Sequence, residues 1–172
     1  MTPAIPTLKT ERLILRGWRA EDIEPFAELS ADADLMRFVG GRMDRIDAWR
    51  RMAAYAGHWQ LRGYGPFALE DRETGRFVGY SGVFDPAGWP EREINWGLTR
   101  PYLGRGLITE AAARVRAYAY ETLGFDTIAS CIAFENTASI AVATRLGATL
   151  DRRVELRGRP AGVFRHLPPN RT

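Results

Sequence analysis

Two glycines, Gly104 and Gly106, lie in a turn between an apolar segment and an alanine-rich stretch, and they point to anion binding. The surrounding sequence is Glu93-Ile-Asn-Trp-Gly-Leu-Thr-Arg-Pro-Tyr-Leu-Gly-Arg-Gly-Leu-Ile-Thr-Glu-Ala-Ala-Ala113. Glycine lets the backbone bend tightly and leaves N–H groups unobstructed, and the helix that follows has unpaired amides and a dipole that favour an anion. A diphosphate fits such a turn. An ordinary strand-to-helix turn is the alternative, because glycine pairs are common in turns.

Two common phosphate loops do not match this turn. It lacks the Lys-Ser/Thr pair of a P-loop, and it lacks the third glycine of a dinucleotide-binding fingerprint. A rarer type of diphosphate loop therefore remains.

A second segment places two polar residues at the start of an expected helix. It reads Ala133-Phe-Glu-Asn136-Thr-Ala-Ser139-Ile-Ala-Val-Ala-Thr-Arg-Leu-Gly147-Ala148. Asn136 and Ser139 are three residues apart, which puts them on one face of that helix. Because Asn, Thr and Ser all satisfy the unpaired amides at a helix start, capping alone is the alternative interpretation.

Together the two segments resemble the two signatures of the GNAT family of N-acetyltransferases. In that family, a strand and a glycine-bearing turn bind the pyrophosphate of acetyl-CoA, and a later Asn opens a helix that ends at Leu-Gly. The order and the spacing match, and the resemblance extends from Thr10 to His166. Within the family, the chain is similar to the branch that contains the bacterial ribosomal-protein N-terminal acetyltransferases.

The resemblance implies that acetyl-CoA is the acetyl donor and indicates which residues bind it. The pantetheine arm is expected between splayed strands around 93–98 and 127–133, with Asn136 binding it and backbone N–H groups of 103–107 binding the pyrophosphate. Arg105 and Arg145 either add charge near the phosphates or are solvated surface arginines. Gly97, inside a strand, is consistent with a β-bulge. The expected cofactor-binding residues are Gly97, Leu98, Leu103, Gly104, Arg105, Gly106, Leu107, Asn136 and Arg145.

Acetyl transfer to an amine needs a neutral amine, a stabilised oxyanion and a proton for the departing thiolate. Glu93 is the first candidate for the base, although a solvated charge at a strand end is an equal alternative. Glu155 is the second candidate, and water alone is the third possibility. The resemblance implies that Ser139 protonates the thiolate. The expected catalytic residues are therefore Glu93, Asn136 and Ser139.

The chain departs from the family pattern at two positions. Many family members carry a tyrosine acid four residues before the stop glycine, where this chain has Ala143, so more of the acid role falls on Ser139. In the phosphate loop, Pro101 stands where the family often has Gln or Arg. This second change matters little if backbone N–H groups supply most of the binding.

Composition indicates one ordinary soluble domain over residues 1–172. The chain is 45% hydrophobic and 26% charged, and its 24 Lys+Arg residues are dispersed, with Lys9 the one lysine. Dispersed arginines argue against nucleic acid as a partner. Cys131, the single cysteine, is expected to be a buried sheet residue, and the spacing of Cys and His predicts no metal site. We expect a cytoplasmic protein without a membrane span, either a monomer or a homodimer.

The hydrophobic pattern predicts an α/β (α+β) fold with a mixed, mostly antiparallel sheet of about seven strands and helices on both faces. Residues 1–9 are expected to be a loose leader. Strands are expected at 11–18, 65–71, 76–84, 91–98, 127–134, 148–155 and 160–166, and helices at 20–31, 45–61, 107–122 and 137–146.

The acceptor is expected in a cleft between residues 38–41 and the 152–162 hairpin. An amine on a protein N-terminus and an amine on a small molecule are both compatible with the sequence, since fold and cofactor do not determine the acceptor. The hairpin arginines would repel a polyamine, which ranks spermidine-like substrates low; they are Arg152, Arg153, Arg157 and Arg159. A non-catalytic acyl-CoA-binding module and a basic nucleic-acid binder are the alternative functions.

Overall fold

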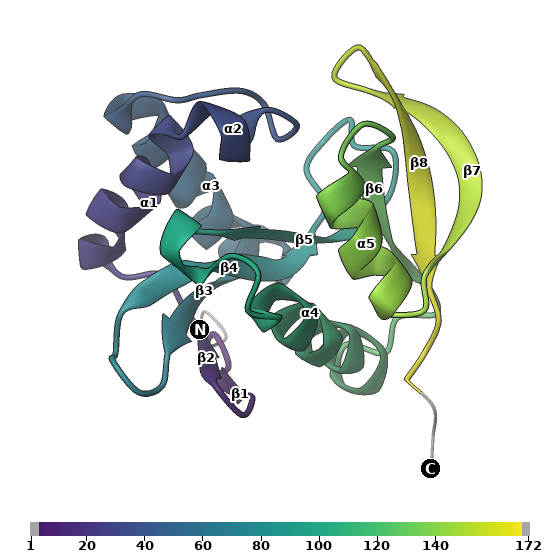
Figure 1. Cartoon of the computed structure of the whole chain (residues 1–172). Helices are drawn as coiled ribbons and strands as arrows, with labels where there is room; N and C mark the ends of the chain where they lie inside the picture. Colours follow the sequence, from purple (N-terminus) through teal and green to yellow (C-terminus); the bar gives the residue numbers. More distant parts are fainter. Residues whose placement is uncertain (1–3, 170–172) are drawn as a thin grey trace.

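A mixed sheet of eight strands forms the centre of the computed structural model, which describes residues 4–169. The spatial order is β1-β2-β3-β4-β5-β6-β8-β7 (Figure 1). Neighbouring strands are antiparallel except β5 and β6, which run parallel. The strands are β1 (Leu8–Lys9), β2 (Leu13–Arg16), β3 (Pro66–Asp71), β4 (Phe77–Phe84), β5 (Glu93–Leu98), β6 (Ile128–Ala133), β7 (Thr149–Leu156) and β8 (Arg159–His166).

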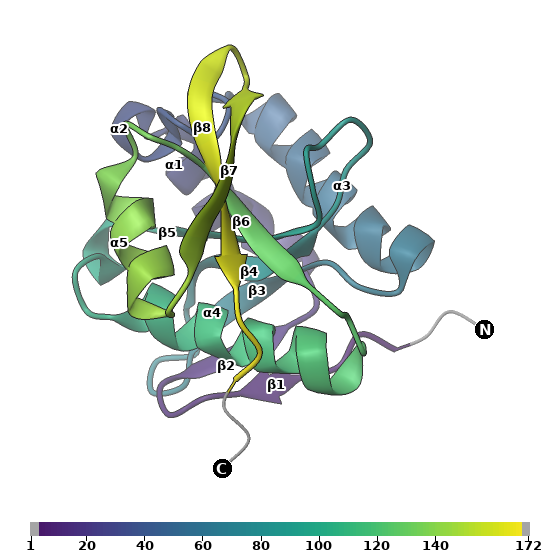
Figure 2. The ribbon, with the colours of Figure 1, turned by 90° about the vertical axis from the view of Figure 1, so that its right-hand side faces the viewer.

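Helices cover both faces of this sheet, as the sequence pattern predicted (Figures 1 and 2). One face carries the first three helices, whose buried residues pack with Ala68, Phe77 and Tyr80 of the sheet. The other face carries α4, and α5 covers β6 and β8 through Ala143. The helices are α1 (Ile23–Ala31), α2 (Ala33–Met36), α3 (Arg45–Arg62), α4 (Leu107–Ala117) and α5 (Thr137–Arg145).

The predicted elements are present, and the differences have local causes. Part of the expected loose leader is the short strand β1, because Leu8 is buried in the main core and pairs with Leu15. The four-residue helix α2 was not predicted; the side chain of Asp32 caps it by accepting from the backbone of Asp34 and Leu35. The helix expected at 107–122 changes from α to a π-helical turn after Ala117.

The β-bulge expected at Gly97 is absent, and that prediction was wrong. Gly97 pairs in regular register with Tyr80 of β4. A Cβ atom at Gly97 would lie 2.6 Å from the ring of Tyr80, so the glycine provides room for that ring and does not bend the strand.

The expected separation of β5 from β6 is confirmed. The two strands share a single paired position, Glu93 with Ala129. Beyond it, side chains bridge the gap: the Ser130 hydroxyl donates to the carbonyl of Ile94 at 2.7 Å, and the amide of Cys131 donates to Glu93 Oε2 at 2.9 Å. Polar backbone groups along the split therefore gain partners without a continued ladder.

A methyl group at Gly97 should destabilise the protein. We expect Gly97→Ala to reduce the free energy of unfolding by about 1–3 kcal/mol, because the ring of Tyr80 must move. Gly57→Ala is the matched control: it lies within α3 with no atom within 4 Å of the new methyl group and should gain about 0.5–1 kcal/mol. Urea unfolding measures both, and a Gly97→Ala protein as stable as the wild type would contradict this role of the glycine.

Candidate functional site

A groove of about 1,020 Å³ runs from the turn before α4 to the start of α5. Gly104, Gly106 and Arg145 line it, and Trp96, Asn136 and Ser139 line it as well. Gly97, Leu98, Leu103 and Leu107 also contribute to its walls. Eight of the nine residues expected to bind the cofactor therefore lie along one groove, the exception being Arg105.

The turn before α4 has the conformation that an anion-binding loop requires. Gly104 and Gly106 have φ values of +72° and +75°, which side chains rarely adopt. Gly106 is the N-cap of α4 and no side chain caps that helix start, so its first amides are available to a ligand. From the outer side, Arg12 Nη1 donates to the carbonyl of Arg105 at 2.8 Å, a contact that local sequence patterns do not reveal.

The two arginines expected near the phosphates differ in position. Arg145 lines the groove. The guanidinium of Arg105 instead lies over the ring of Tyr102, 5.4 Å from its centre, and its side chain is not part of the groove wall. The side chain of Arg105 is therefore a surface arginine, as in the second of the two interpretations of the sequence, while its backbone belongs to the turn.

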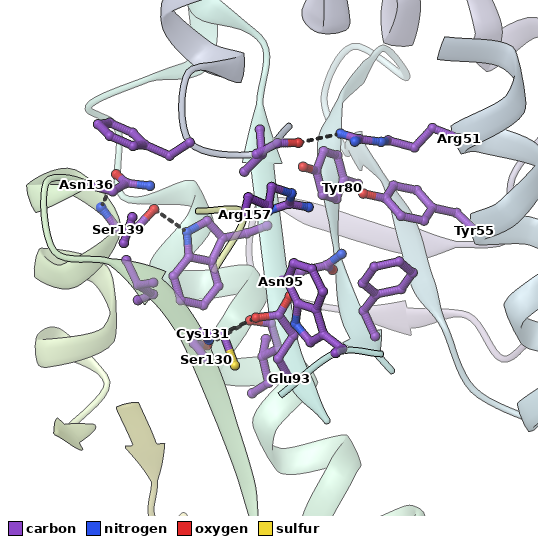
Figure 3. A pocket seen from close by; sticks show the side chains of 18 residues that line it. Arg51, Tyr55, Tyr80, Glu93, Asn95, Ser130, Cys131, Asn136, Ser139 and Arg157 are labelled. Carbon is purple, nitrogen blue, oxygen red and sulfur yellow. Dashed lines mark hydrogen bonds between the residues drawn. The ribbon is translucent and has the colours of Figure 1, made fainter. Parts of the chain in front are cut away.

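A smaller cavity of about 70 Å³ adjoins the groove, and Figure 3 shows the side chains that line it. The residues that line both spaces, where the cavity and the groove meet, are Phe38, Val39, Tyr80, Trp96, Asn136 and Ser139. The remaining polar lining of the cavity comes from separate elements of the fold. It comprises Arg51, Tyr55, Glu93, Asn95, Ser130, Cys131 and Arg157.

Glu93 is a buried carboxyl group in this cavity, with only 6% of the residue exposed. Burial raises its pKa to about 8, against the opposing effects of the Cys131 amide, Arg157 and Trp89. The alternative of a solvated strand-end charge was wrong. Near neutral pH both the protonated and the ionised form of this side chain are populated, which suits a general base.

Glu155, the second candidate for the base, is not in the site. It is exposed on β7, opposite Pro160, and it lines neither the groove nor the cavity. Among the two candidates, only Glu93 is placed beside Ser139 and Asn136 in the same cavity.

Asn136 and Ser139 act together at the start of α5. Asn136 Oδ1 accepts a hydrogen bond from the backbone of Ser139 at 3.2 Å, so Asn136 caps α5, and this contact leaves its amide NH₂ group free of the cap. Trp96 Nε1 donates to Ser139 Oγ, also at 3.2 Å. The Ser139 oxygen is thus an acceptor in this contact, and its own hydrogen remains available for donation.

No side chain at position 143 reaches the site, because Ala143 is fully buried in the core. A different phenol is nearby: Tyr80 lines both the cavity and the groove. Burial raises its pKa, so the hydroxyl keeps its proton at neutral pH.

Sequence reasoning did not identify Arg51, Tyr55, Tyr80 or Asn95 as site residues. They lie on α3, β4 and β5. The alternation of side chains along a strand assigns Tyr80 and Asn95 to one face of the sheet, but it does not show that this face lines a cavity. Their convergence depends on how α3 packs on the sheet, and Figure 3 shows the four side chains around the cavity.

The four hairpin arginines do not act as one group. Arg157 alone among them lines the cavity, and its guanidinium lies 4.6 Å from the ring centre of Trp89. Two of the others form ion pairs, Arg152 with Glu91 at 2.9 Å and Arg159 with Glu135 at 2.8 Å, and Arg153 lies over the ring of Phe134. Of the four hairpin arginines, only Arg157 is therefore placed to repel a polyamine in the cavity.

The remaining reactive side chains have structural roles. Cys131 is buried, as predicted, and burial raises the pKa of its thiol to about 12, so it stays protonated. Burial also lowers the pKa of His166 to about 4, and its Nε2 lies 2.8 Å from Ser130 Oγ. Within residues 4–169, no cluster of His, Cys, Asp and Glu is arranged to hold a metal ion, and no helix is both long and apolar enough to cross a membrane.

Comparison with protein families gives a match over most of the chain. The model described as an acetyltransferase (GNAT) domain matches residues 12–149. The chain belongs to the GNAT acetyltransferase family. Members of this family use acetyl-CoA, so this GNAT protein is an acetyl-CoA-dependent N-acetyltransferase.

Solved structures agree with the GNAT fold. An acetyltransferase from Agrobacterium tumefaciens is 33% identical, with a TM-score of 0.88 and 97% of each chain covered. An alanine acetyltransferase of a ribosomal protein from Vibrio fischeri is 12% identical, with a TM-score of 0.71 and coverage of 95% of this chain and 97% of that one. A spermidine N-acetyltransferase from Vibrio cholerae, solved with CoA and spermine, is 18% identical, with a TM-score of 0.71 and coverage of 90% and 93%.

The buried Glu93 should make stability depend on pH. Its folded-state pKa of about 8 lies above the ordinary value of 4.5, so its favourable contribution is present below about pH 4.5 and is lost as the pH rises to about 8. Glu93→Gln has no ionisable group at this position, so it does not lose stability in this way as the pH rises. The stability of the variant relative to wild type should therefore increase across that window, by at most about 1.4 kcal/mol per pH unit.

Thermal unfolding across the same pH range measures this effect. Glu155→Gln, at an exposed position, is the control and should follow the wild-type curve. A constant difference between Glu93→Gln and wild type at all pH values would show that the carboxyl group is not held protonated by burial.

Proposed function

We propose that this GNAT protein transfers the acetyl group of acetyl-CoA directly to a primary amine within a ternary complex. The observation that carries the proposal is the junction of the groove with the smaller cavity at Trp96, Asn136 and Ser139, with buried Glu93 in the cavity wall. The donor enters from one side of this junction and the acceptor amine from the other.

The groove offers suitable contacts along its length for the donor. The amides after Gly104 and Gly106 bind the diphosphate, and Arg145 adds a positive charge. The gap between β5 and β6 takes the pantetheine arm, and the Asn136 side chain lies beside it. Because Asn136 Oδ1 already accepts from Ser139, its amide group is the part that is left to donate to the arm.

Glu93 and Ser139 accept and donate the protons that acetyl transfer requires. The amine nitrogen forms a bond to the acetyl carbonyl carbon while the carbon–sulfur bond breaks. Glu93 in its carboxylate form takes the proton that the amine loses, directly or through water, and Ser139 gives a proton to the departing sulfur and regains one from solvent. A base with a pKa of about 8 is well matched to an α-amine, whose pKa is about 7.7–8.0.

A covalent acyl-enzyme is disfavoured by the state of the one thiol in the cavity. The Cys131 thiol has a pKa of about 12 because of burial and the nearby Glu93. Thiolate is the reactive form of cysteine, so this residue is a poor nucleophile and direct transfer is the simpler route.

The acceptor is either a protein N-terminus or a small-molecule amine. Similarity to the ribosomal-protein branch favours an N-terminus, whereas one structural neighbour is a spermidine N-acetyltransferase. An α-amine costs less to deprotonate than a lysine-like amine, by about 3 kcal/mol near neutral pH. This difference favours an α-amine, and an acyl-CoA-binding module without turnover is the second candidate function.

Donor binding should depend on the backbone of the turn before α4. Gly104→Glu places a side chain and a negative charge in the diphosphate site, so calorimetry should show a loss of CoA affinity of at least about 100-fold. Gly75→Glu is the matched control, since both glycines have positive φ and open surroundings, and it should bind CoA like wild type. Equal affinity of Gly104→Glu and wild type would contradict the assigned site.

The proton donor can be tested separately from binding. Ser139→Ala should retain CoA binding and lose about 10²–10⁴-fold in kcat, measured by thiol release with an acceptor selected from N-terminal peptides, amino acids, polyamines and aminoglycosides. Thr137→Ala, at an exposed position in the first turn of α5, is the control. Near-wild-type turnover by Ser139→Ala would remove Ser139 from the mechanism, and CoA binding without turnover on any acceptor would favour the non-catalytic module.

A further inference from the structure

Two arginines from distant parts of the chain converge on one end of the cavity. Arg51 comes from α3 and Arg157 from the tip of the β7–β8 hairpin. Both approach Gly40: a Cβ atom built there would lie 2.8 Å from Arg51 Nη2 and 3.8 Å from Arg157 Nε. Two guanidinium groups therefore flank the same small space (Figure 3).

Neither the Arg51 nor the Arg157 guanidinium group is in direct contact with a carboxylate of the described residues. Arg51 Nη1 donates to the carbonyl of Val39 at 2.8 Å. Desolvation and the nearby Arg51 lower the pKa of Arg157, and the charge of Glu93 opposes this effect. Arg157 stays partly solvated because the residue is exposed, and two neighbouring guanidinium groups without a bound carboxylate offer charged donors to an anion.

Two phenols add uncharged donors at the same end. Tyr55 and Tyr80 line the cavity with their ring centres 5.3 Å apart. Burial raises the pKa of both hydroxyl groups, so each keeps its proton. The charges of Arg51 and Glu93 both act on the two phenols, so the phenols lie near both charged groups.

Two further residues that line the cavity, Asn95 and Glu93, offer acceptors. Asn95 Oδ1 is buried and, within the described part of the chain, has no hydrogen-bond partner. Glu93 lies on the same face of β5, two residues away, and uses Oε2 for the Cys131 amide. A buried acceptor without a donor is costly, so an N–H group of a ligand fits beside Asn95 and Glu93.

We propose that the acceptor is an amine that also carries a carboxylate, on a molecule or residue of amino-acid size. The carboxylate binds between Arg51 and Arg157 with Tyr80 donating to it, and the amine faces Asn95 and Glu93 at the junction with the groove. The inference rests on the proposed function. The carboxylate belongs either to a free amino acid or to an acidic first residue of a peptide, and the same contacts serve both.

The same cavity can bind the acid group and the amine of one small substrate. A carboxylate held by guanidinium groups forms charge-assisted hydrogen bonds, which are about twice as strong as neutral ones, and the planar fork of arginine matches carboxylate geometry. With its acid group fixed at Arg51 and Arg157, the substrate has its amine directed toward Glu93. Binding at one end thereby orients the nucleophile at the other.

The test compares carboxylates with their amides. Free amino acids, the corresponding amino-acid amides, peptides that begin with Asp or Glu, peptides that begin with Asn or Gln, and spermidine are offered with acetyl-CoA. Within each pair, the carboxylate should have the higher kcat/KM. Arg157→Gln should raise KM for the carboxylate about 10–100-fold and leave the amide nearly unchanged. Arg153→Gln, whose side chain lies over Phe134, is the matched control and should behave like wild type.

Preference for amino acids or for acidic peptides identifies the source of the carboxylate, and both outcomes support the proposal. Equal turnover of carboxylates and amides, a preference for spermidine, or identical effects of Arg157→Gln and Arg153→Gln would overturn it while leaving acetyl transfer intact. If no acceptor turns over, calorimetry with N-acetylated amino acids in the presence of CoA decides: binding that weakens in Arg157→Gln supports the site, and its absence in wild type overturns it. Failure of CoA itself to bind would instead contradict the proposed function.

Discussion

The site depends on the interruption between β5 and β6. These parallel strands pair only at Glu93 and Ala129, and polar backbone groups cannot remain buried without partners. Here the partners are side chains: the Glu93 carboxyl accepts from the amide of Cys131, and the Ser130 hydroxyl donates to the carbonyl of Ile94. The split is thus stabilised by the groups that line the cavity it creates.

The positions of the other site residues follow from this split. Glu93 must be buried to bridge the strands, and burial is what raises its pKa. The same gap opens toward Trp96, Ser139 and Asn136, where the groove meets the cavity. One carboxyl group therefore both bridges the split strands and carries the raised pKa that the proposed base requires.

Local features of the fold and site were readable from the sequence. The turn at Gly104 and Gly106 depends on backbone conformations that glycine adopts easily, and Asn136 caps the helix that directly follows it. Both are determined within a few residues, which is why motif spacing identified them. Helix and strand positions were predicted for the same reason, since periodicity reflects which face of each element is buried.

Long-range convergence could not be read in this way. Arg51, Tyr80 and Arg157 meet only because α3, β4 and a hairpin pack around the cavity, and no local spacing encodes that packing. A glycine inside a strand can mark either a bulge or a close approach of a neighbouring group, and the sequence does not distinguish the two. At Gly97 the neighbouring group is the ring of Tyr80, which lies on the adjacent strand. The four hairpin arginines are close in sequence, but they contact different partners and only Arg157 faces the cavity.

Infrared spectroscopy shows directly whether Glu93 bridges the split strands with a carboxyl group that is protonated near neutral pH. The difference between wild type and Glu93→Gln isolates the carboxyl C=O stretch of this side chain from about pH 6 to about pH 10. The structure predicts a protonated-acid band at the low end that disappears with a midpoint near pH 8. A band already absent at about pH 6 would show an ionised, solvated carboxylate and contradict the account.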